Sequence, residues 1–442
     1  MENIKIGIDC HNLEGQRTGV GRYLWNLISE WSKQDFVYNL RDRVNCIQFF
    51  LYFKNEIPND IRKLPEYPHD REDITKVWNY KALGGKSNAL FKHYLLPRAV
   101  AKDNVYVLFC PDYVLPIPLV FLSSFSKLVS LVYTKVRRSS YFCIKTAVTI
   151  HDIIYEARPG EYSWPSRADK ILLRWASKQS AKKADIIFVP SEFTRSAVIK
   201  YYKVNPKKVV MTPLAPDTIF RQFARTEGVE ELRLPPPVPS PPVRGRVEVG
   251  GDGIKKSFVV SERYFLFVGS IFNRRFLPQK IKGFAEFAKK YTDFSFLIIG
   301  NNNTKPYQDI GALVAQTNAE LGRAAVIWKD YASDEELVRV YNGAFATLWI
   351  SSYEGFGLPI LESMACGTPV ITSRAGSLPE VAGNAALYIE NPQNGEEITS
   401  ALSLLARDSA YYNTLVQKGI TQAAKFSWQK CGEATIDKIK LL

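Results

Sequence analysis

Two glutamates in the stretch YEGFGLPILE, residues 353–362, are spaced so that they could grip hydroxyl groups of one ligand. Glu354 precedes two glycines, and Glu362 follows eight positions later in an expected helix. The preceding residues, FATLWISS, are typical of a strand, so the pair lies where a strand passes into a helix, a usual place for ligands in α/β proteins. A carboxylate there can accept hydrogen bonds from vicinal sugar hydroxyls. The alternative is two acids that merely favour a helix start.

Glycines and arginines near expected strand ends indicate a second kind of chemistry, the binding of phosphate. Gly355 and Gly357 allow backbone amides to converge on an oxygen, and Gly269 ends another expected strand shortly before Arg274 and Arg275. Two guanidiniums just before a helix suit a diphosphate, since each can fork onto phosphate oxygens. The alternative is a solvated basic turn.

A third glycine-rich turn, RTGVGRY, follows the first expected strand, and Gly19 and Gly21 could bring its backbone close to a phosphate or a sugar. The dinucleotide fingerprint needs another glycine where this chain has Leu24. The turn therefore argues against an NAD enzyme.

Alternating strand and helix patterns must position these loops, and the alternation runs through both halves of the chain. Expected strands lie at residues 5–10, 105–110, 146–152, 184–191, 264–270, 294–302, 324–330, 345–352, 369–373 and 386–389. Such spacing suits parallel sheets with helical crossovers. We predict an α/β protein of two doubly wound Rossmann-like domains facing across a cleft. The predicted parts are domains at 1–215 and 262–427, a proline- and glycine-rich linker at 216–261, and a helix at 428–442 that crosses back to the first domain.

Composition limits the partners of this 442-residue chain. Lys and Arg total 58 against 44 Asp and Glu, a net charge of +14, which favours polyanions or an anionic membrane surface, or reflects no specific partner. No nucleic-acid-binding module is recognisable. The six cysteines form no CxxC pair and lie mostly in apolar surroundings, which indicates reduced thiols and a reducing compartment. Residues 114–138 contain prolines and Lys127, so they suit an amphipathic helix on a bilayer, or a core-packed segment, better than a spanning helix.

The stretch SSYEGFGLPILESMACGTPVITS resembles the signature of the glycosyl transferases group 1, family 4 of the retaining glycosyltransferases with the GT-B fold. The segments GIDCHNLEGQRTGVGRY, VTIHDIIYEARPGEY, VPSEFTRSAVIKYY and VGSIFNRRFLPQKIKGF are similar to other parts of that family, so the resemblance extends across most of the chain. The family's basic pair is usually Arg-Lys, whereas this chain has two arginines. The insertion at 235–257 is not a feature of the family.

The resemblance implies a nucleotide sugar on the second domain and an acceptor on the first. Glu354 would hold hydroxyls of the donor sugar and Glu362 the nucleoside ribose, while Arg274 and Arg275 would neutralise the diphosphate. The other implied donor-binding residues are Gly19, Gly21, Gly269, Gly355, Phe356, Gly357 and Leu358. His151 would lie near the sugar, or else be a core histidine bonded to backbone.

The resemblance favours GDP-mannose as donor over a UDP-sugar, because the loops look most like those of bacterial mannosyltransferases of surface-polysaccharide assembly. A glycan or lipid-linked acceptor is expected, with no cofactor and no nucleic acid. No Asp-x-Asp motif occurs, so we expect a metal-independent retaining hexosyltransferase. The expected location is cytoplasmic and peripheral at the inner face of the membrane. The alternative is a catalytically silent GT-B protein that binds a nucleotide sugar or partners an active glycosyltransferase.

Overall fold

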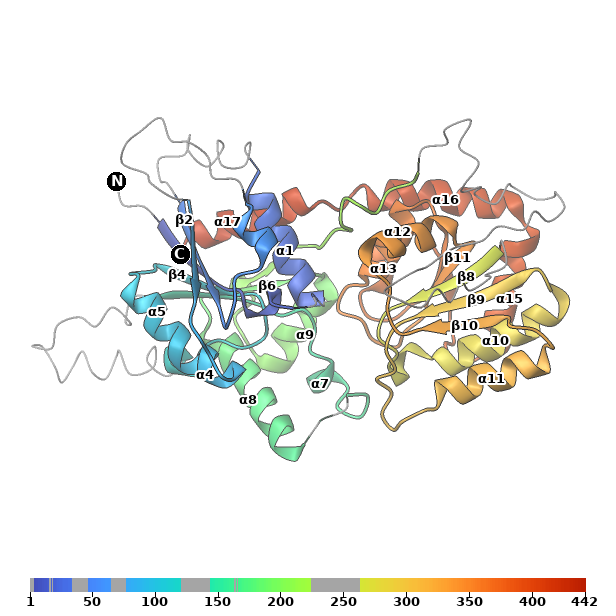
Figure 1. Ribbon diagram of the computed structural model, residues 1–442, viewed down its shortest axis with the longest axis horizontal. Coiled ribbons are helices and arrows are strands. Elements are labelled where there is room, and N and C mark those ends of the chain that lie inside the picture. Colours follow the sequence, from blue (N-terminus) through green and yellow to red (C-terminus); the bar gives the residue numbers. More distant parts are fainter. Residues whose placement is uncertain are drawn as a thin grey trace, which may run out of the picture. The chain divides into compact units, whose positions relative to one another are not determined.

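The computed structural model describes residues 4–15, 17, 19–33, 47–64, 77–120, 144–162, 164, 166–223 and 263–442. The chain divides into two compact units, one made of Met1–Leu214 with Trp428–Leu442 and the other of Ala215–Ser427. Each unit is a parallel sheet with helices on both of its faces (Figure 1). The proline-rich residues 233–257, and residues 121–138 of the apolar basic segment, lie outside the described residues.

The first unit contains a seven-stranded parallel sheet. Its strands are β1 (Ile4–Asp9), β2 (Ile47–Phe53), β3 (Trp78–Ala82), β4 (Val107–Cys110), β5 (Lys145–Thr149), β6 (Ile186–Val189) and β7 (Val209–Met211). Central strands such as β4 (VLFC) and β6 (IIFV) are wholly apolar and buried, because helices cover both faces of a parallel sheet. The order is β3-β2-β1-β4-β5-β6-β7, so the direction of winding reverses between β1 and β4.

Helices and short turns of helix connect these strands. They are η1 (His11–Leu13), α1 (Gly19–Trp31), α3 (Asn59–Arg62), α4 (Asn88–Leu90), η2 (Phe91–Leu95), α5 (Leu96–Lys102), α7 (Ile154–Ala157), α8 (Arg167–Lys183), α9 (Glu192–Tyr202), η4 (Pro206–Lys208) and α17 (Trp428–Lys440). Ser191 starts α9 by accepting a hydrogen bond from the Thr194 N–H at 3.1 Å. The last helix, α17, packs on this unit, where the indole N–H of Trp31 donates to the Gly432 carbonyl at 3.1 Å.

The second unit contains a six-stranded parallel sheet. Its strands are β8 (Arg263–Val268), β9 (Phe294–Ile299), β10 (Val326–Lys329), β11 (Ala346–Trp349), β12 (Val370–Ser373) and β13 (Leu387–Ile389). Its helices are η5 (Asn273–Arg275), α10 (Leu277–Lys290), α11 (Ile310–Glu320), α12 (Asp334–Gly343), α13 (Leu358–Ala365), α14 (Leu378–Ala382), α15 (Gly395–Arg407) and α16 (Ser409–Ala423). The strand order β10-β9-β8-β11-β12-β13 reverses between β8 and β11.

The predicted fold class is confirmed, since both units are doubly wound parallel α/β structures. Strands β2, β3 and β7 were not among the expected strands, although β2 (IQFFLYF) is a continuous run of mostly apolar residues. Four cysteines of the described chain, Cys10, Cys110, Cys366 and Cys431, are buried free thiols. Within the ranges given above, no helix is long and apolar enough to cross a bilayer.

The two reversals determine where ligands can bind. In an open parallel sheet, the loops that follow the two strands at a reversal diverge to opposite faces and leave a crevice at the carboxyl edge. The loops after β1 and β4 occupy that position in the first unit, and those after β8 and β11 occupy it in the second.

Candidate active site

The loops after β8 and β11 meet in the second unit at a buried arginine–glutamate pair. The Ser352 N–H donates to the Arg274 carbonyl at 2.9 Å and joins the two loops. Arg275 Nε donates to Glu354 Oε1 at 2.8 Å, and Arg275 Nη2 donates to Oε2 at 3.2 Å. Its third nitrogen, Nη1, donates to the Ser270 carbonyl at 2.7 Å. The fork therefore fixes the Glu354 carboxylate with a two-point geometry.

The charge of Glu354 is set by burial and by two guanidiniums. Burial alone would raise the pKa of Glu354, but Arg275 and Arg274 outweigh burial and hold that pKa below its usual value. Arg274 Nε lies 3.9 Å from Glu354 Oε1, and only 8% of Glu354 is exposed. The site therefore keeps a carboxylate and two cations together at neutral pH, with the anion able to accept further hydrogen bonds.

Trp349, the last residue of β11, forms a floor between the two loops. A Cβ added to Gly269 would lie 3.0 Å from Trp349 Cη2, and one added to Gly357 would lie 3.8 Å from its Nε1. Both glycines have positive φ, +131° and +113°, which other residues rarely adopt. The guanidinium carbon of Arg275 lies 4.4 Å from the indole centroid. The indole therefore spans the distance between the loops and supports Arg275.

The loop after β12 fixes the backbone of the glutamate loop. Ser377 Oγ donates to the carbonyls of Glu354, at 2.9 Å, and of Phe356, at 2.7 Å. A Cβ on Gly376 would lie 2.6 Å from the Glu354 carbonyl oxygen, so only glycine permits this approach. Gly357 is then the N-cap residue of α13, and the first amides of that helix, which have no partner within it, follow directly after the loop.

The second glutamate of the signature is also buried. Glu362 is the fifth residue of α13, and Tyr341 donates its hydroxyl to Glu362 Oε2 at 2.9 Å. Phe356 packs edge-on against Phe426, with ring centroids 5.8 Å apart. Leu358 is the first residue of α13.

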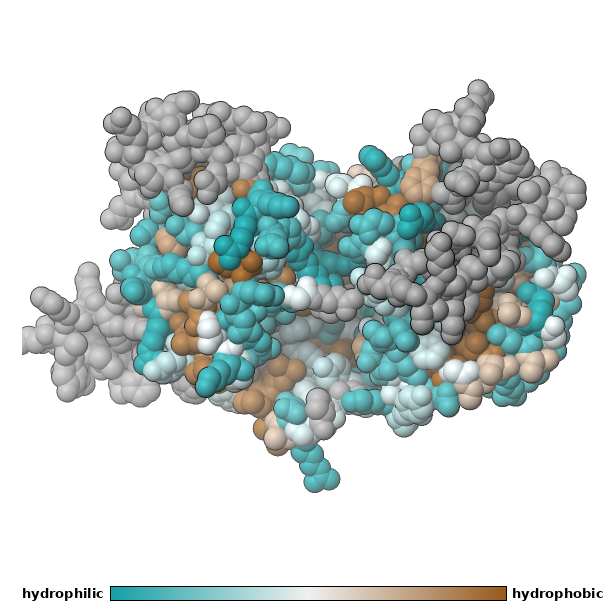
Figure 2. Space-filling view, viewed as in Figure 1, coloured by the Kyte–Doolittle hydropathy of each residue, from teal (hydrophilic) through white to brown (hydrophobic). Residues whose placement is uncertain are grey.

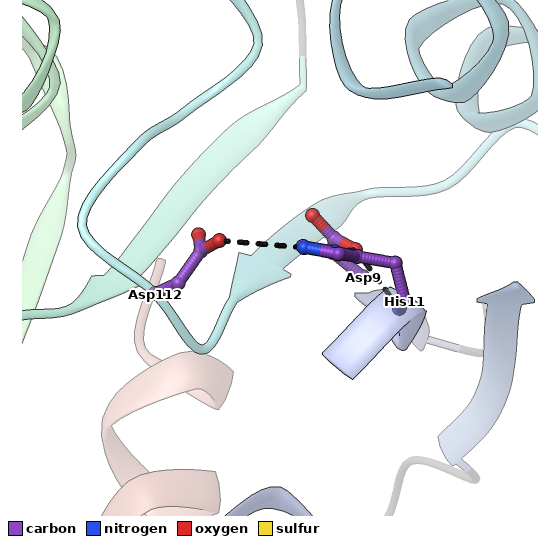
Figure 3. Close-up of side chains that lie close together, drawn as sticks. All are labelled: Asp9, His11 and Asp112. Carbon is purple, nitrogen blue, oxygen red and sulfur yellow. Dashed lines mark hydrogen bonds and ion pairs between the residues drawn. The ribbon is translucent and has the colours of Figure 1, made fainter. Parts of the chain in front are cut away.

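A second cluster of ionisable side chains lies at the reversal in the first unit (Figure 3). Asp9 is the last residue of β1, and Asp112 follows the end of β4 by two positions. His11 Nδ1 lies 2.6 Å from Asp9 Oδ1, and its Nε2 lies 3.9 Å from Asp112 Oδ2. The Lys92 ammonium, on η2, pairs with Asp112 and lies 3.2 Å from Asp9 Oδ2.

Opposite charges decide the protonation of this cluster. Burial alone would raise the pKa of Asp9, but Lys92 and His11 lower it well below its usual value. Burial alone would lower the pKa of His11, but the field and hydrogen bond of Asp9 raise it. Ligand atoms of Asp9, His11 and Asp112 all lie within 4.8 Å of one another, a spacing that a divalent cation could use. Lys92 already supplies a neutralising charge there, so the cluster has no electrostatic need of a metal.

Three further predicted residues lie in the first unit. His151 Nε2 lies 2.9 Å from the Pro111 carbonyl and donates its N–H to it; burial lowers the pKa of His151, which favours the neutral ring. A Cβ on Gly21 would lie 2.4 Å from the Asn12 carbonyl, so this glycine serves the packing of α1 on η1. Gly19 begins α1 and has open space at its Cβ position.

The sequence matches models of two protein families, one in each unit. The model of the glycosyl transferases group 1 matches residues 254–422, most of the second unit, and that of Glycosyltransferase Family 4 matches residues 118–218.

The second unit belongs to the glycosyl transferases group 1 family. The resemblance noted in the sequence is therefore confirmed. This glycosyltransferase is 27% identical over 301 residues to the O-antigen chain mannosyltransferase B of Escherichia coli, a match that covers 67% of the present chain and 71% of that protein.

Solved structures show the same GT-B fold. Sucrose-phosphate synthase from Thermosynechococcus elongatus has a TM-score of 0.60, with 16% identity and 99% of each chain covered. Anabaena Alr3699/HepE in complex with UDP-glucose has a TM-score of 0.63, with 12% identity and 100% of each chain covered. At such identities the structural likeness establishes only the fold of this glycosyltransferase.

Sequence reasoning missed several residues that shape these sites. In the second unit, Trp349, Gly376 and Ser377 support Glu354, yet each lies in a segment that reads as an ordinary strand end or turn. In the first unit, the cluster around Asp9 and His11 was also missed. Its signal was a carboxylate at the end of the first strand, in GIDCHN, and a second in CPDY after another strand.

Proposed function

We propose that this glycosyltransferase moves a hexose from a nucleotide sugar, with retention of anomeric configuration, onto a glycan or lipid-linked acceptor of surface-polysaccharide synthesis. The observation that carries the proposal is the Arg275–Glu354 fork at the strand-order reversal of the second unit. It combines cations for a diphosphate with a carboxylate for sugar hydroxyls in the region that the family model matches.

The chemistry needs fixed positive charge where the leaving group departs. Breaking a sugar–phosphate bond places negative charge on the diphosphate, and preorganised donors stabilise that charge best. In the proposed complex, Arg274, Arg275 and the first amides of α13, at Gly357 and Leu358, face the diphosphate. Glu354 accepts hydrogen bonds from the hexose hydroxyls.

The remaining predicted donor residues complete the proposal. Glu362 would take the ribose hydroxyls from its place on α13, with Tyr341 holding one of its oxygens. Gly269 and Gly355, which have no side chain, would let the phosphates come close to the backbone. Gly19 would act from the start of α1 in the first unit.

Retention is proposed to occur at the front face of the sugar. Glu354 is a poor nucleophile, because its carboxylate is held and neutralised by Arg275. A leaving-phosphate oxygen would instead accept the proton of the acceptor hydroxyl while that hydroxyl oxygen bonds to the anomeric carbon. His151, neutral and anchored at the Pro111 carbonyl, would offer its other ring nitrogen to a sugar hydroxyl.

We propose GDP-mannose as the donor, with a UDP-sugar as the alternative. The O-antigen mannosyltransferase of Escherichia coli supports the first, and the UDP-glucose complex of the Anabaena protein supports the second. Two guanidiniums and helix-start amides can supply the charge that other enzymes take from a metal, so we propose that the reaction needs no metal.

The reversal in the first unit is the proposed acceptor site. The 3.9 Å between His11 Nε2 and Asp112 Oδ2 is too long for a strong hydrogen bond and leaves room for one hydroxyl to contact both. A protonated His11 would donate to the hydroxyl oxygen, and the hydroxyl would donate to Asp112. Asp9 orients the ring by accepting from its Nδ1.

A membrane surface is the proposed location of the acceptor. On α8, the side chains of Ile171 and Leu172 are 71% and 58% exposed, with Trp175 beside them and Arg174 and Lys178 on the same helix. Apolar residues gather over this helix (Figure 2). We expect binding to vesicles of anionic lipid, weakened by Ile171→Glu and unchanged by Tyr307→Glu, an exposed aromatic of the second unit.

Thermal-shift measurements with GDP-mannose, UDP-glucose, UDP-GlcNAc and ADP-glucose test the proposed function. A ligand that binds only the folded state raises the melting temperature by mass action. One nucleotide sugar should stabilise the protein more than its free nucleoside does, and should release nucleoside diphosphate on incubation. Binding without release would indicate a silent GT-B protein, and no binding would overturn the proposal.

A further inference from the structure

Lys280 is a buried lysine beneath the arginine–glutamate pair. It lies on α10, five positions after Arg275, and its exposed fraction is 0%. Within the described part of the chain, its ammonium nitrogen has no hydrogen-bond partner. Lysine is almost never fully buried unless it is paired, because an unpaired ammonium loses its hydration. Neither the mechanism above nor the packing of α10 explains this amine.

An aromatic pair connects Lys280 to the candidate site. Its Nζ lies 4.3 Å from the ring centroid of Phe267, on β8. Phe267 stacks with Trp349, at 5.7 Å between centroids, and the Arg275 guanidinium lies 4.4 Å from the indole centroid. Two basic groups therefore share one aromatic pair, on the two strands where the sheet order reverses.

The charges that act on Lys280 favour its neutral form while no ligand is bound. Burial lowers the pKa of Lys280 well below its usual value, and the positive charge of Arg275 lowers it further. Glu354 opposes both effects, but that carboxylate is largely compensated by the guanidiniums around it. Burying a neutral amine costs much less free energy than burying an ammonium ion. The neutral form therefore explains how the Lys280 side chain can lie in the core.

We propose that Lys280 is a third basic group of this anion site, and that it takes up a proton when a nucleoside diphosphate binds beside Arg275. The inference rests on the proposed function. The arriving negative charge stabilises the ammonium over the amine, and solvent supplies the proton, so no bond other than N–H forms. The same charge would then favour departure of the diphosphate, which gains negative charge as the sugar leaves.

Calorimetric titration of the full chain with UDP and GDP tests this proposal. Each titration is run at pH 8 in two buffers of different ionisation enthalpy, which yields the number of protons taken up. We expect about one proton per bound diphosphate for the wild type. Lys280→Met, which keeps an unbranched apolar chain, should take up none and bind the diphosphate at least tenfold more weakly at pH 7. Lys282→Met, an exposed lysine of the same helix, should match the wild type.

Each outcome separates the possibilities. Wild-type affinity and proton uptake in Lys280→Met would overturn the inference and leave the proposed function standing. Binding of a diphosphate by the wild-type protein without proton uptake would also overturn the inference. That measurement needs no variant, so the inference can be tested even if Lys280→Met does not fold. If the wild type binds neither diphosphate, the proposed function fails and this inference fails with it.

Discussion

Arg275 donates two hydrogen bonds to Glu354, 79 positions later in the chain, at 2.8 and 3.2 Å. The sequence predicts separate duties for these residues, diphosphate for one and sugar hydroxyls for the other. The structure shows them paired, with the third nitrogen of Arg275 on the Ser270 carbonyl. Arg275 therefore positions Glu354 as well as supplying charge. The effects of substituting Arg275 and of substituting Glu354 should for this reason not be additive.

Glu354→Gln should lower turnover at least tenfold, about 1.4 kcal/mol, because a neutral amide is a weaker acceptor for sugar hydroxyls and for Arg275. The fold should be kept, with stability reduced by about 1–3 kcal/mol. Release of nucleoside diphosphate and urea unfolding measure the two effects. The matched control is Glu390→Gln, which breaks an exposed pair with Arg374 and should cost less than about 1 kcal/mol. Near-normal turnover of Glu354→Gln would refute the assigned role.

Gly376→Ala should weaken donor binding and stability by displacing the glutamate loop. The added Cβ would meet the Glu354 carbonyl at 2.6 Å, on a residue with φ of +60°. Gly322→Ala has a similar φ of +64° but open space, so it measures the backbone cost alone, about 1–2 kcal/mol. Equal unfolding free energies and equal donor affinities for the two variants would show that the close approach has no consequence.

His11 should make stability depend on pH. Its folded pKa is raised above the usual 6.5, so its contribution is fully present below pH 6.5 and is lost as pH rises through the folded pKa. The difference in unfolding free energy between the wild type and His11→Gln should therefore shrink from pH 6 to pH 8.5. A difference that stays constant, or grows toward high pH, would contradict the pairing with Asp9.

Activity should persist in EDTA, since Arg274, Arg275 and helix-start amides provide the positive charge at the leaving group. The assay is release of nucleoside diphosphate after dialysis against the chelator, with and without added Mg²⁺ or Mn²⁺. Strict dependence on either ion would refute metal independence, and would direct attention to the group of Asp9, His11 and Asp112.

The fold class and part of the candidate site were predictable from local patterns. Strand-to-helix junctions follow from apolar runs and glycines, and the signature around Glu354 follows from its spacing. The Arg275–Glu354 fork was not predictable, because hydrogen bonding between residues 79 positions apart depends on β8 and β11 being neighbours. Lys280 was hidden for a similar reason: in LPQKIKGF it reads as one more exposed lysine, and only packing on Phe267 reveals its burial.

The most direct test of the central claim compares nucleoside diphosphates with nucleosides by equilibrium binding. If the arginine–glutamate site holds a diphosphate, GDP or UDP should bind at least a hundredfold more tightly than guanosine or uridine, about 2.7 kcal/mol. That ratio should fall at least tenfold in Arg274→Met, while affinity for the nucleoside stays near the wild-type value. Equal affinities for nucleoside and diphosphate, or an unchanged ratio in the variant, would contradict the account.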